Sequence, residues 1–377
     1  MNYFIKNIHI NKLFHLENID IPIENEKYPH LIITGKNGSG KTVLLDAITE
    51  SFNNLLREPG LNILKELLSG KINIQFCDEK SIIEKYDHHD FIIAFYQAYR
   101  KIKMIEPMSP TKPVILHVGI RDTSTDKFLA FLSDLKIQEA LARNEKQFDD
   151  ANEINAWFVD FEKLLRQIFQ DDNLKLEFNY KDYSFWICTE GKKFKFTQLS
   201  DGFAAALDIV ADLILKMQDS NTLTRSYQKE GIVMIDEIET HLHLGLQKII
   251  MPMLTQIFPN IQFIVTTHSP FVLNSMPDAV AYDLEHQEPI DDLTNYSYES
   301  LAEGYFGVST ESSTVEMRLR RLQELLSNNV LTDSDKNEIR QLMVELDKIS
   351  EAVSPDLVGE YLQIKINNVD KIKEIGK

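Results

Sequence analysis

Cysteine is nearly absent from this chain, which has only Cys77 and Cys188 among its 377 residues. Two distant cysteines match neither the paired spacing of a zinc site nor a disulfide-stabilised secreted scaffold. No apolar run approaches the roughly 20 residues that a membrane-spanning helix needs, and the amino terminus, MNYFIKNIHI, carries no signal peptide. We therefore expect a soluble cytoplasmic protein without a membrane partner.

Positive charge is also scarce. The chain has 40 Lys and Arg against 58 Asp and Glu, which gives a formal net charge of −18. Such an excess of carboxylates disfavours binding of nucleic acid or an anionic membrane by the surface as a whole. Nucleic acid stays a candidate partner only through a local basic patch. Internal repeats and low-complexity segments are missing too, and the length suggests about two domains.

One stretch departs from this ordinary background, Gly35-Lys36-Asn37-Gly38-Ser39-Gly40-Lys41-Thr42. It has the G-x-x-x-x-G-K-[ST] spacing of a phosphate-binding loop, between an apolar run at 31–34 and an amphipathic run at 43–48. Glycines let backbone N–H groups turn towards a phosphate chain at a helix N-terminus. Lys41 would bind the β- and γ-phosphates, and the Thr42 hydroxyl would bind Mg²⁺. The sequence therefore predicts a strand, loop and helix that bind a nucleoside triphosphate.

Acidic residues follow a second apolar run. The run at 232–235 ends in Asp236 and Glu237. A carboxylate at a strand end can bind the nucleotide Mg²⁺, and its neighbour can act as general base towards the attacking water. The next apolar run, 261–265, leads to His268, at the strand edge where open α/β sheets bind ligands. Surface acids and a structural histidine are the alternatives.

Two further segments are less specific. Gln97 follows an apolar strand and would reach Mg²⁺ or a γ-phosphate, or else would bind only backbone as a loop residue. Ser200, Asp201 and Gly202 precede an apolar helix that runs to about Met217. A helix start of this kind offers N–H donors to an anion, although many are plain N-caps.

The remaining sequence suggests four regions, namely 1–100, 101–189, 190–285 and 286–377. The second opens with three prolines and continues as a long helical segment from about 125 to 170, followed by a hairpin at 174–187. An aromatic stripe along this segment, including Trp157, Phe158 and Phe161, is expected to be a packing face. The fourth region is expected to be mainly helical, with Thr332 and Asp335 forming a capping-box-like helix start.

In this order, the motifs resemble those of the ABC-type ATPase heads of the SMC, RecF and OLD group. In that group Gly35–Thr42 corresponds to the phosphate loop, Gln97 to the Q-loop, Leu199–Gly202 to the signature, Asp236-Glu237 to Walker B and His268 to the switch histidine. The match covers 3–100 and 190–285. It implies an α/β fold, an ABC-type P-loop head with a mixed sheet, a compact helical insertion and a helical C-terminal tail. Asp201 and Phe203 depart from the L-S-G-G-Q signature of transporter heads.

The resemblance also implies roles for these residues. ATP and Mg²⁺ would be the cofactors, with Thr42, Asp236 and Gln97 at the metal and Glu237 and His268 catalytic. Two heads of this group sandwich two nucleotides, so Ser200 and Gly202 of one subunit would contact the γ-phosphate held by the other, and Asp201 belongs to the same nucleotide-binding signature. Gln75 also lies near a predicted strand end and is the other candidate for the Q-loop residue.

A narrower resemblance concerns Phe128–Leu199 and Glu239–Phe271, which look like short ATPases of prokaryotic anti-phage systems, including Septu- and retron-associated ones. This resemblance implies an ATP-hydrolysing homodimer, or a higher homo-oligomer, that gates an effector encoded nearby, a nuclease or a toxin. A repair factor like RecF, which binds DNA, is the alternative, and a transporter ATPase is disfavoured by the signature. Asp333 and Asp335 lie at a predicted helix start instead of a strand end, so we expect no built-in nuclease.

Overall fold

The structure, a computed structural model, describes residues 4–23, 30–56, 70–100, 104–109, 112–114, 119–218, 227, 229–276, 279–290, 296–298, 300–301, 304, 313–328, 331–348 and 355–375. The chain divides into two compact units, Met1–Tyr298 and Glu299–Lys377. The sequence-based start of the last region, at residue 286, falls inside the first unit, because the strand Glu288–Ile290 pairs there. The short helix that the sequence suggests near 62–68 is outside the described residues.

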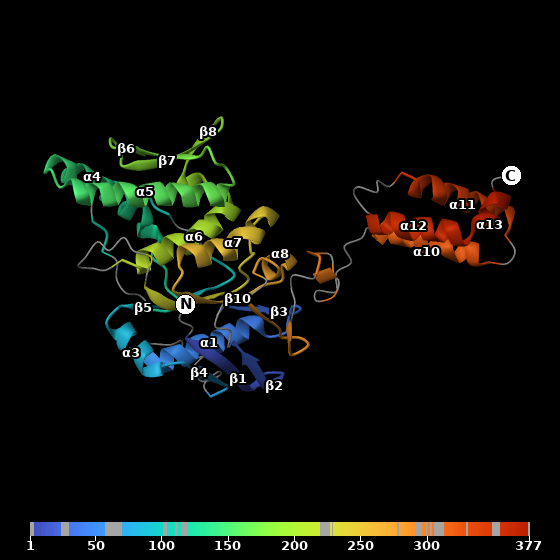
Figure 1. The fold of residues 1–377 in the computed structure, drawn as a ribbon, viewed down its shortest axis with the longest axis horizontal. Coiled ribbons are helices and arrows are strands. Elements are labelled where there is room, and N and C mark those ends of the chain that lie inside the picture. Colours follow the sequence, from blue (N-terminus) through green and yellow to red (C-terminus); the bar gives the residue numbers. More distant parts are fainter. Residues whose placement is uncertain are drawn as a thin grey trace. The chain divides into compact units, whose positions relative to one another are not determined.

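A six-stranded sheet organises the first unit (Figure 1). Its strands, in spatial order, are β12 (Glu288–Ile290), β11 (Val280–Asp283), β3 (Leu31–Thr34), β10 (Ile261–Thr266), β9 (Glu230–Ile235) and β5 (Phe91–Tyr96). All neighbours pair in parallel except β12, which is antiparallel to β11. Every residue of β3, β5 and β10 is buried, as expected for parallel strands covered on both faces. The predicted mixed α/β sheet is confirmed.

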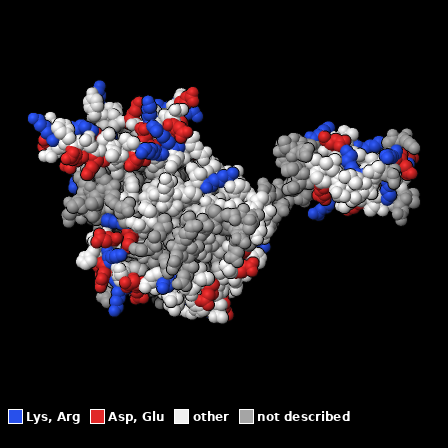
Figure 2. Space-filling model, in the orientation of Figure 1, with Lys and Arg blue, Asp and Glu red and all other residues white. Residues whose placement is uncertain are grey.

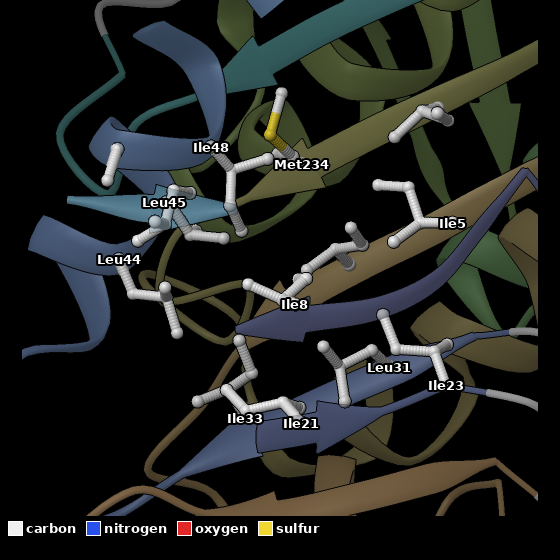
Figure 3. Close-up of a cluster of buried hydrophobic side chains, with 14 of the residues drawn as sticks. Ile5, Ile8, Ile21, Ile23, Leu31, Ile33, Leu44, Leu45, Ile48 and Met234 are labelled. Atoms are coloured by element: carbon white, nitrogen blue, oxygen red, sulfur yellow. The ribbon is translucent and has the colours of Figure 1, made fainter. Parts of the chain in front are cut away.

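One face of this sheet is covered by α1 (Lys41–Leu56) and a small antiparallel sheet. That sheet has the order β2 (Leu16–Pro22), β1 (Ile5–Leu13), β4 (Ile72–Phe76), and α3 (Glu79–Asp87) packs nearby. Aliphatic side chains from all these layers form one core, of which Figure 3 labels Ile8, Leu45, Ile48, Ile33 and Met234. Burial of each such side chain contributes about 1.5–3 kcal/mol. This core fixes β3 and α1, and therefore the loop that joins them.

The opposite side of β10 carries α6 (Asp201–Lys216) and α7 (Leu244–Ile257), as Figure 1 shows, and α8 (Pro270–Leu273) contacts α7. The α6 helix is apolar on almost every side, yet it also buries Asp208 and Asp212. Asp212 accepts hydrogen bonds from the Tyr96 hydroxyl at 2.7 Å and the Ser124 N–H at 2.7 Å. These bonds attach α6 to the end of β5.

An insertion packs on α6. It consists of a 3₁₀ turn (Thr125–Lys127), α4 (Phe128–Asn144), α5 (Phe148–Phe169), a three-stranded antiparallel sheet and a second 3₁₀ turn (Phe196–Gln198). The strands are β6 (Lys175–Asn179), β7 (Ser184–Thr189) and β8 (Lys192–Lys195). The aromatic stripe is buried as expected, with Trp157 stacked on Phe161. The predicted helical segment consists of two helices, because the chain breaks after Asn144 with Lys146 at φ 61°, and the predicted hairpin has a third strand.

The second unit is helical, with α10 (Ser313–Ser327), α11 (Asp333–Leu346), α12 (Pro355–Asn367) and α13 (Val369–Ile375) around their own core. The Thr332 hydroxyl accepts from the Asp335 N–H, and the Asp335 carboxylate accepts in return from the Thr332 N–H at 2.8 Å, which is the expected capping box. The helical C-terminal region is confirmed. Among the helices that the structure describes, none is long and apolar enough to cross a membrane.

Candidate active site

The glycine-rich loop joins β3 to α1 and curls as its sequence predicts. Gly35, Gly38 and Gly40 have φ angles of 132°, 87° and 98°, which L-residues with a side chain rarely adopt. The Lys41 ammonium lies under this loop and donates to the carbonyl oxygens of Gly35 at 2.7 Å and Lys36 at 3.0 Å. Burial lowers the pKa of Lys41, and the Glu237 and Asp236 carboxylates oppose this shift. A phosphate chain would replace the loop carbonyls as the partner of this ammonium.

Oxygen donors for a metal meet where β3 and β9 end. The Thr42 hydroxyl donates to Asp236 Oδ2 at 2.9 Å, and the Thr266 hydroxyl donates to Oδ1 of the same buried carboxylate at 2.6 Å. A hydroxyl and a carboxylate are hard ligands that suit Mg²⁺, which keeps phosphate oxygens and waters as its other ligands. Thr42 and Asp236 therefore fit a nucleotide-bound Mg²⁺. Among the described residues, no cluster of three His, Cys, Asp or Glu forms a metal site of another kind.

Glu237 follows Asp236 at the same sheet edge. Its φ of 43° lies in the left-handed region, an uncommon conformation for a residue with a side chain. The backbone is held there because the Glu237 N–H donates to the Thr266 hydroxyl oxygen at 2.8 Å. Its carboxylate is partly buried and accepts from the Thr240 hydroxyl at 3.3 Å. The sheet thus fixes the backbone of Glu237 beside the predicted metal ligand, as a general base requires.

His268 lies in the segment between β10 and α8. The Thr267 N–H donates to the Ile33 carbonyl oxygen at 3.0 Å, which attaches this segment to the phosphate-loop strand. Burial and the nearby Lys41 charge lower the pKa of His268, so its imidazole is neutral at pH 7. A neutral imidazole can donate from one ring nitrogen and accept at the other.

The predicted signature residues lie at the start of α6. Ser200 is the N-cap residue, but its side chain makes no capping hydrogen bond and is exposed. Gly202 is packed so closely that an added Cβ would come within 2.7 Å of the His241 carbonyl oxygen. The segment just after Glu237 therefore supports the N-terminus of α6. Within the described residues, no hydrogen bond joins 199–202 to the phosphate loop.

Comparisons with known proteins agree with this arrangement. Residues 136–274 match the family described as "AAA domain, putative AbiEii toxin, Type IV TA system". The Septu protein PtuA of Bacillus mycoides (strain KBAB4) is 27% identical over 379 residues, which cover 92% of this chain and 50% of that protein. The probable ATPase of retron Ec83 from Escherichia coli is 44% identical over 80 residues, 21% of this chain and 15% of that one. Over the matched residues the chain is similar to ATPases of this kind.

The match to the Septu relative covers most of this chain, but this chain spans only about half the length of that relative. Among solved structures, an Smc head bound to the C-winged helix domain of ScpA covers 78% of this chain and 96% of its own, at 14% identity and a TM-score of 0.42. A nucleotide-free ATP-binding cassette from an ABC transporter covers 77% and 90%, at 16% identity and a TM-score of 0.38.

The two glutamine candidates differ in position within the head. Gln97 directly follows β5, and the Tyr96 carbonyl before it accepts from the Asp236 N–H at 2.8 Å. Its side chain is exposed, and its carbonyl accepts from Arg100 at 3.4 Å. Gln75 lies instead in β4 of the small antiparallel sheet. Gln97 therefore follows a strand whose end is bonded to Asp236, the predicted metal ligand. A contact between Gln97 and a metal stays a prediction.

Two residues near the phosphate loop were missed by sequence reasoning. His15, in the turn between β1 and β2, has its Nε2 3.2 Å from the Ser39 carbonyl oxygen. Glu285, just after β11, accepts from the Lys36 N–H at 3.1 Å and from the Lys36 ammonium at 2.9 Å. The sequence offered only a weak indication that Glu285 lies near the loop, because Glu285 follows a strand that ends beside β3. Nothing in the sequence marked His15, since its contact depends on how the small sheet packs.

Proposed function

We propose that this head binds and hydrolyses ATP as a dimer, and that the cycle controls a separate effector protein in anti-phage defence. The convergence of Lys41, Thr42, Asp236, Glu237 and His268 at one sheet edge carries the hydrolysis part of this proposal. Three adjacent parallel strands, β3, β10 and β9, deliver these residues. This is the edge at which open α/β sheets bind ligands.

The chemical roles follow from the positions. The loop N–H groups and Lys41 would bind the phosphates, and Thr42 and Asp236 would hold a Mg²⁺ ion, which would supply positive charge to the phosphates. Glu237 takes a proton from the attacking water and passes it to solvent after the phosphate leaves. His268, neutral at pH 7, donates a hydrogen bond towards the γ-phosphate oxygens.

Support for a dimer comes from the start of α6. Its exposed Ser200 hydroxyl and free helix N-terminus form a second anion-binding surface, with no described hydrogen bond to the phosphate loop of the same chain. A two-fold pairing would bring each such surface onto the nucleotide of the other chain. ATP would then hold two heads together, and hydrolysis would release them.

The defence role is supported by the likeness to Septu and retron proteins and by the surface charge. On the face shown in Figure 2, acidic and basic side chains lie intermixed along the rim of α4 and β6–β8. Two of the lysines there are paired with carboxylates, Lys193 with Glu177 at 2.6 Å and Lys136 with Glu139 at 2.9 Å. A net charge of −18 and lysines already neutralised favour a protein effector over direct DNA binding by the head.

The decisive experiment measures phosphate release and oligomeric state for Glu237→Gln. We expect turnover to fall about 10²–10⁴-fold and an ATP-dependent dimer to accumulate in light scattering. Glu230→Gln, at the other end of β9 and paired with Lys85, is the matched control and should hydrolyse normally. Near-normal turnover by Glu237→Gln would refute the assignment. Expression with its neighbouring genes, followed by phage challenge, tests the defence role. Protection unaffected by Glu237→Gln would contradict it.

A further inference from the structure

The segment Asp236–His243 contains a third acidic residue, Glu239, to which the proposed chemistry gives no role. It lies in the turn between Glu237 and α7 and is partly buried. Its carboxylate oxygens both point to the segment that contains His268. The His268 N–H donates to Oε1 at 2.5 Å, and the Thr267 hydroxyl donates to Oε2 at 2.8 Å.

Among the described residues, these are the two hydrogen bonds that other residues donate to this carboxylate. None of the ion pairs within the described residues includes Glu239, although Lys41 and Arg100 are close enough to interact with its charge. Burial raises the pKa of Glu239, and the bonds from Thr267 and the His268 N–H favour the charged form. The two carboxylate oxygens of Glu239 each accept one of these bonds, and a charged acceptor forms shorter and stronger hydrogen bonds than a neutral one.

The same segment is attached to the sheet and to α7 and α8 at its two ends. Before His268, the Thr34 hydroxyl donates to the Thr267 carbonyl oxygen at 3.2 Å. After His268, the Ser269 hydroxyl donates to Gln247 Oε1 at 2.7 Å and caps α8. These contacts hold the ends of the segment. Glu239 is the contact that ties its middle to the turn that follows Glu237.

We propose that Glu239 positions His268 relative to Glu237, so that both reach the same γ-phosphate. This inference rests on the proposed ATP hydrolysis. Glu239 is a positioning residue, since it acts through the backbone of His268 and through Thr267 and makes no described hydrogen bond to the phosphate loop. Its loss would therefore slow the chemical step and leave the affinity for ATP unchanged.

The geometry explains why the residue is a glutamate. A glutamine has one oxygen, which can accept from the His268 N–H. Its amide NH₂ would then face the Thr267 hydroxyl oxygen, which already accepts from the Ser269 N–H at 2.9 Å. Glutamine thus keeps the bond from the His268 N–H, but its NH₂ can contact Thr267 only as a donor, which leaves the Thr267 hydroxyl proton without its acceptor. Thr267→Val removes the bond between Thr267 and Glu239 from the opposite side without any change in charge, and Thr267→Ser restores the hydroxyl.

The test is steady-state hydrolysis by Glu239→Gln, Thr267→Val, Thr267→Ser and the double variant Glu239→Gln/Thr267→Val. We expect kcat to fall about 10–100-fold in Glu239→Gln and Thr267→Val, with unchanged KM. Thr267→Ser should keep the wild-type kcat. The double variant should lose no more than Thr267→Val alone, because Thr267→Val already removes the bond that the two residues share, together with the bond from the Ser269 N–H.

Two results would overturn the inference. One is wild-type kcat in both Glu239→Gln and Thr267→Val, and the other is a loss of ATP affinity equal to the loss of kcat. If Glu239→Gln does not fold, the contrast between Thr267→Val and Thr267→Ser still decides. Failure of the proposed function would give a different result. Either the wild-type protein would release no phosphate, or Glu237→Gln would hydrolyse ATP as fast as the wild-type protein.

Discussion

Thr42 and Asp236 are 194 positions apart in the sequence, yet the Thr42 hydroxyl donates to Asp236 Oδ2 at 2.9 Å. The contact joins the first turn of α1 to the end of β9, across the strand β10 that lies between β3 and β9. Since the Thr42 hydroxyl and the Asp236 carboxylate are both oxygen ligands and lie side by side, these two residues could hold a Mg²⁺ ion together.

This contact predicts how hydrolysis depends on Mg²⁺. Thr42→Val removes the hydroxyl and keeps the branched shape, so the Mg²⁺ concentration for half-maximal hydrolysis should rise about 10–100-fold, the equivalent of one charged contact worth about 1.5–3 kcal/mol. Thr42→Ser keeps the hydroxyl and should need the wild-type concentration. Titration of Mg²⁺ into protein stripped with a chelator measures both. A wild-type titration curve for Thr42→Val would exclude Thr42 as a ligand.

Nucleotide affinity should depend on Lys41 much more than on Lys36, although both lie in the same loop. The Lys41 ammonium is buried under the loop, whereas the exposed Lys36 ammonium pairs with Glu285. Lys41→Ala should abolish binding of a fluorescent ATP analogue without unfolding, because its bonds are to loop atoms only. Lys36→Ala removes the same charge and should bind nearly normally, since exposed pairs contribute about 0–1 kcal/mol. Equal ATP affinities of the two variants would mean that Gly35–Thr42 is a turn that does not bind the phosphates.

Acid should destabilise the first unit through His30. This residue is only 1% exposed, and burial lowers its pKa to about 4. Its Nδ1 accepts from the Phe263 N–H at 3.2 Å, which requires the neutral ring. Between about pH 6.5 and 4 the unfolded chain binds a proton that the folded chain does not, so stability falls with falling pH, by about 3 kcal/mol when complete.

The comparison uses urea unfolding followed by tryptophan fluorescence, because Trp157 and Trp186, the two tryptophans of the chain, lie in the first unit. His30→Asn keeps an acceptor for Phe263 and should flatten the pH dependence between pH 7.5 and 5. His286→Gln is the control, because the pKa of His286 is shifted in the opposite direction and its effect on stability has the opposite pH dependence. Asp283 raises the pKa of the exposed His286, so its contribution is present at acid pH and is lost as the pH rises. An unchanged slope in His30→Asn would contradict the assignment.

The fold class followed from the sequence because its signals are local. The phosphate loop is a contiguous motif, and the strands around it are short apolar runs of the kind that parallel sheets require. The position of Thr42 and Asp236 at one edge was also predictable, since the parallel strands of one sheet have their carboxyl ends along the same edge, and only β10 separates β3 from β9. The capping box of Thr332 and Asp335 is another local signal that the structure confirms.

The features that the sequence did not predict are breaks and contacts that depend on packing. The break between α4 and α5 occurs at Glu145–Gln147, where no proline or glycine marks it. The strand β8 is a short lysine-rich segment whose pairing with β7 carries no periodic signal of its own. The bonds from Thr267 and the His268 N–H to Glu239 join two loops that only the order β10–β9 brings together. Such contacts depend on the register of distant elements, which local pattern does not specify.

A shared site between two subunits makes the strongest prediction about Ser200. In a closed two-fold pair each chain contributes the same surface that it receives, so each nucleotide site has a phosphate loop from one chain and a signature from the other. Ser200→Arg places a long cation at the exposed N-cap of α6, where Ser200 makes no capping bond to lose. The variant should therefore fold and bind ATP but hydrolyse it poorly, because the second head cannot close.

Mixing Ser200→Arg with Lys41→Ala separates a shared site from a site within one chain. Each variant alone should be inactive, the first because every signature is blocked and the second because every phosphate loop is empty. In the mixed dimer, the intact loop of the Ser200→Arg chain faces the intact signature of the Lys41→Ala chain, so one of the two sites is restored. Partial recovery of phosphate release on mixing is the expected result. If differently tagged chains pair without recovery, independent shared sites are contradicted. Wild-type hydrolysis by Ser200→Arg alone would refute the role of the signature altogether, because then no partner surface at Ser200 is needed for turnover.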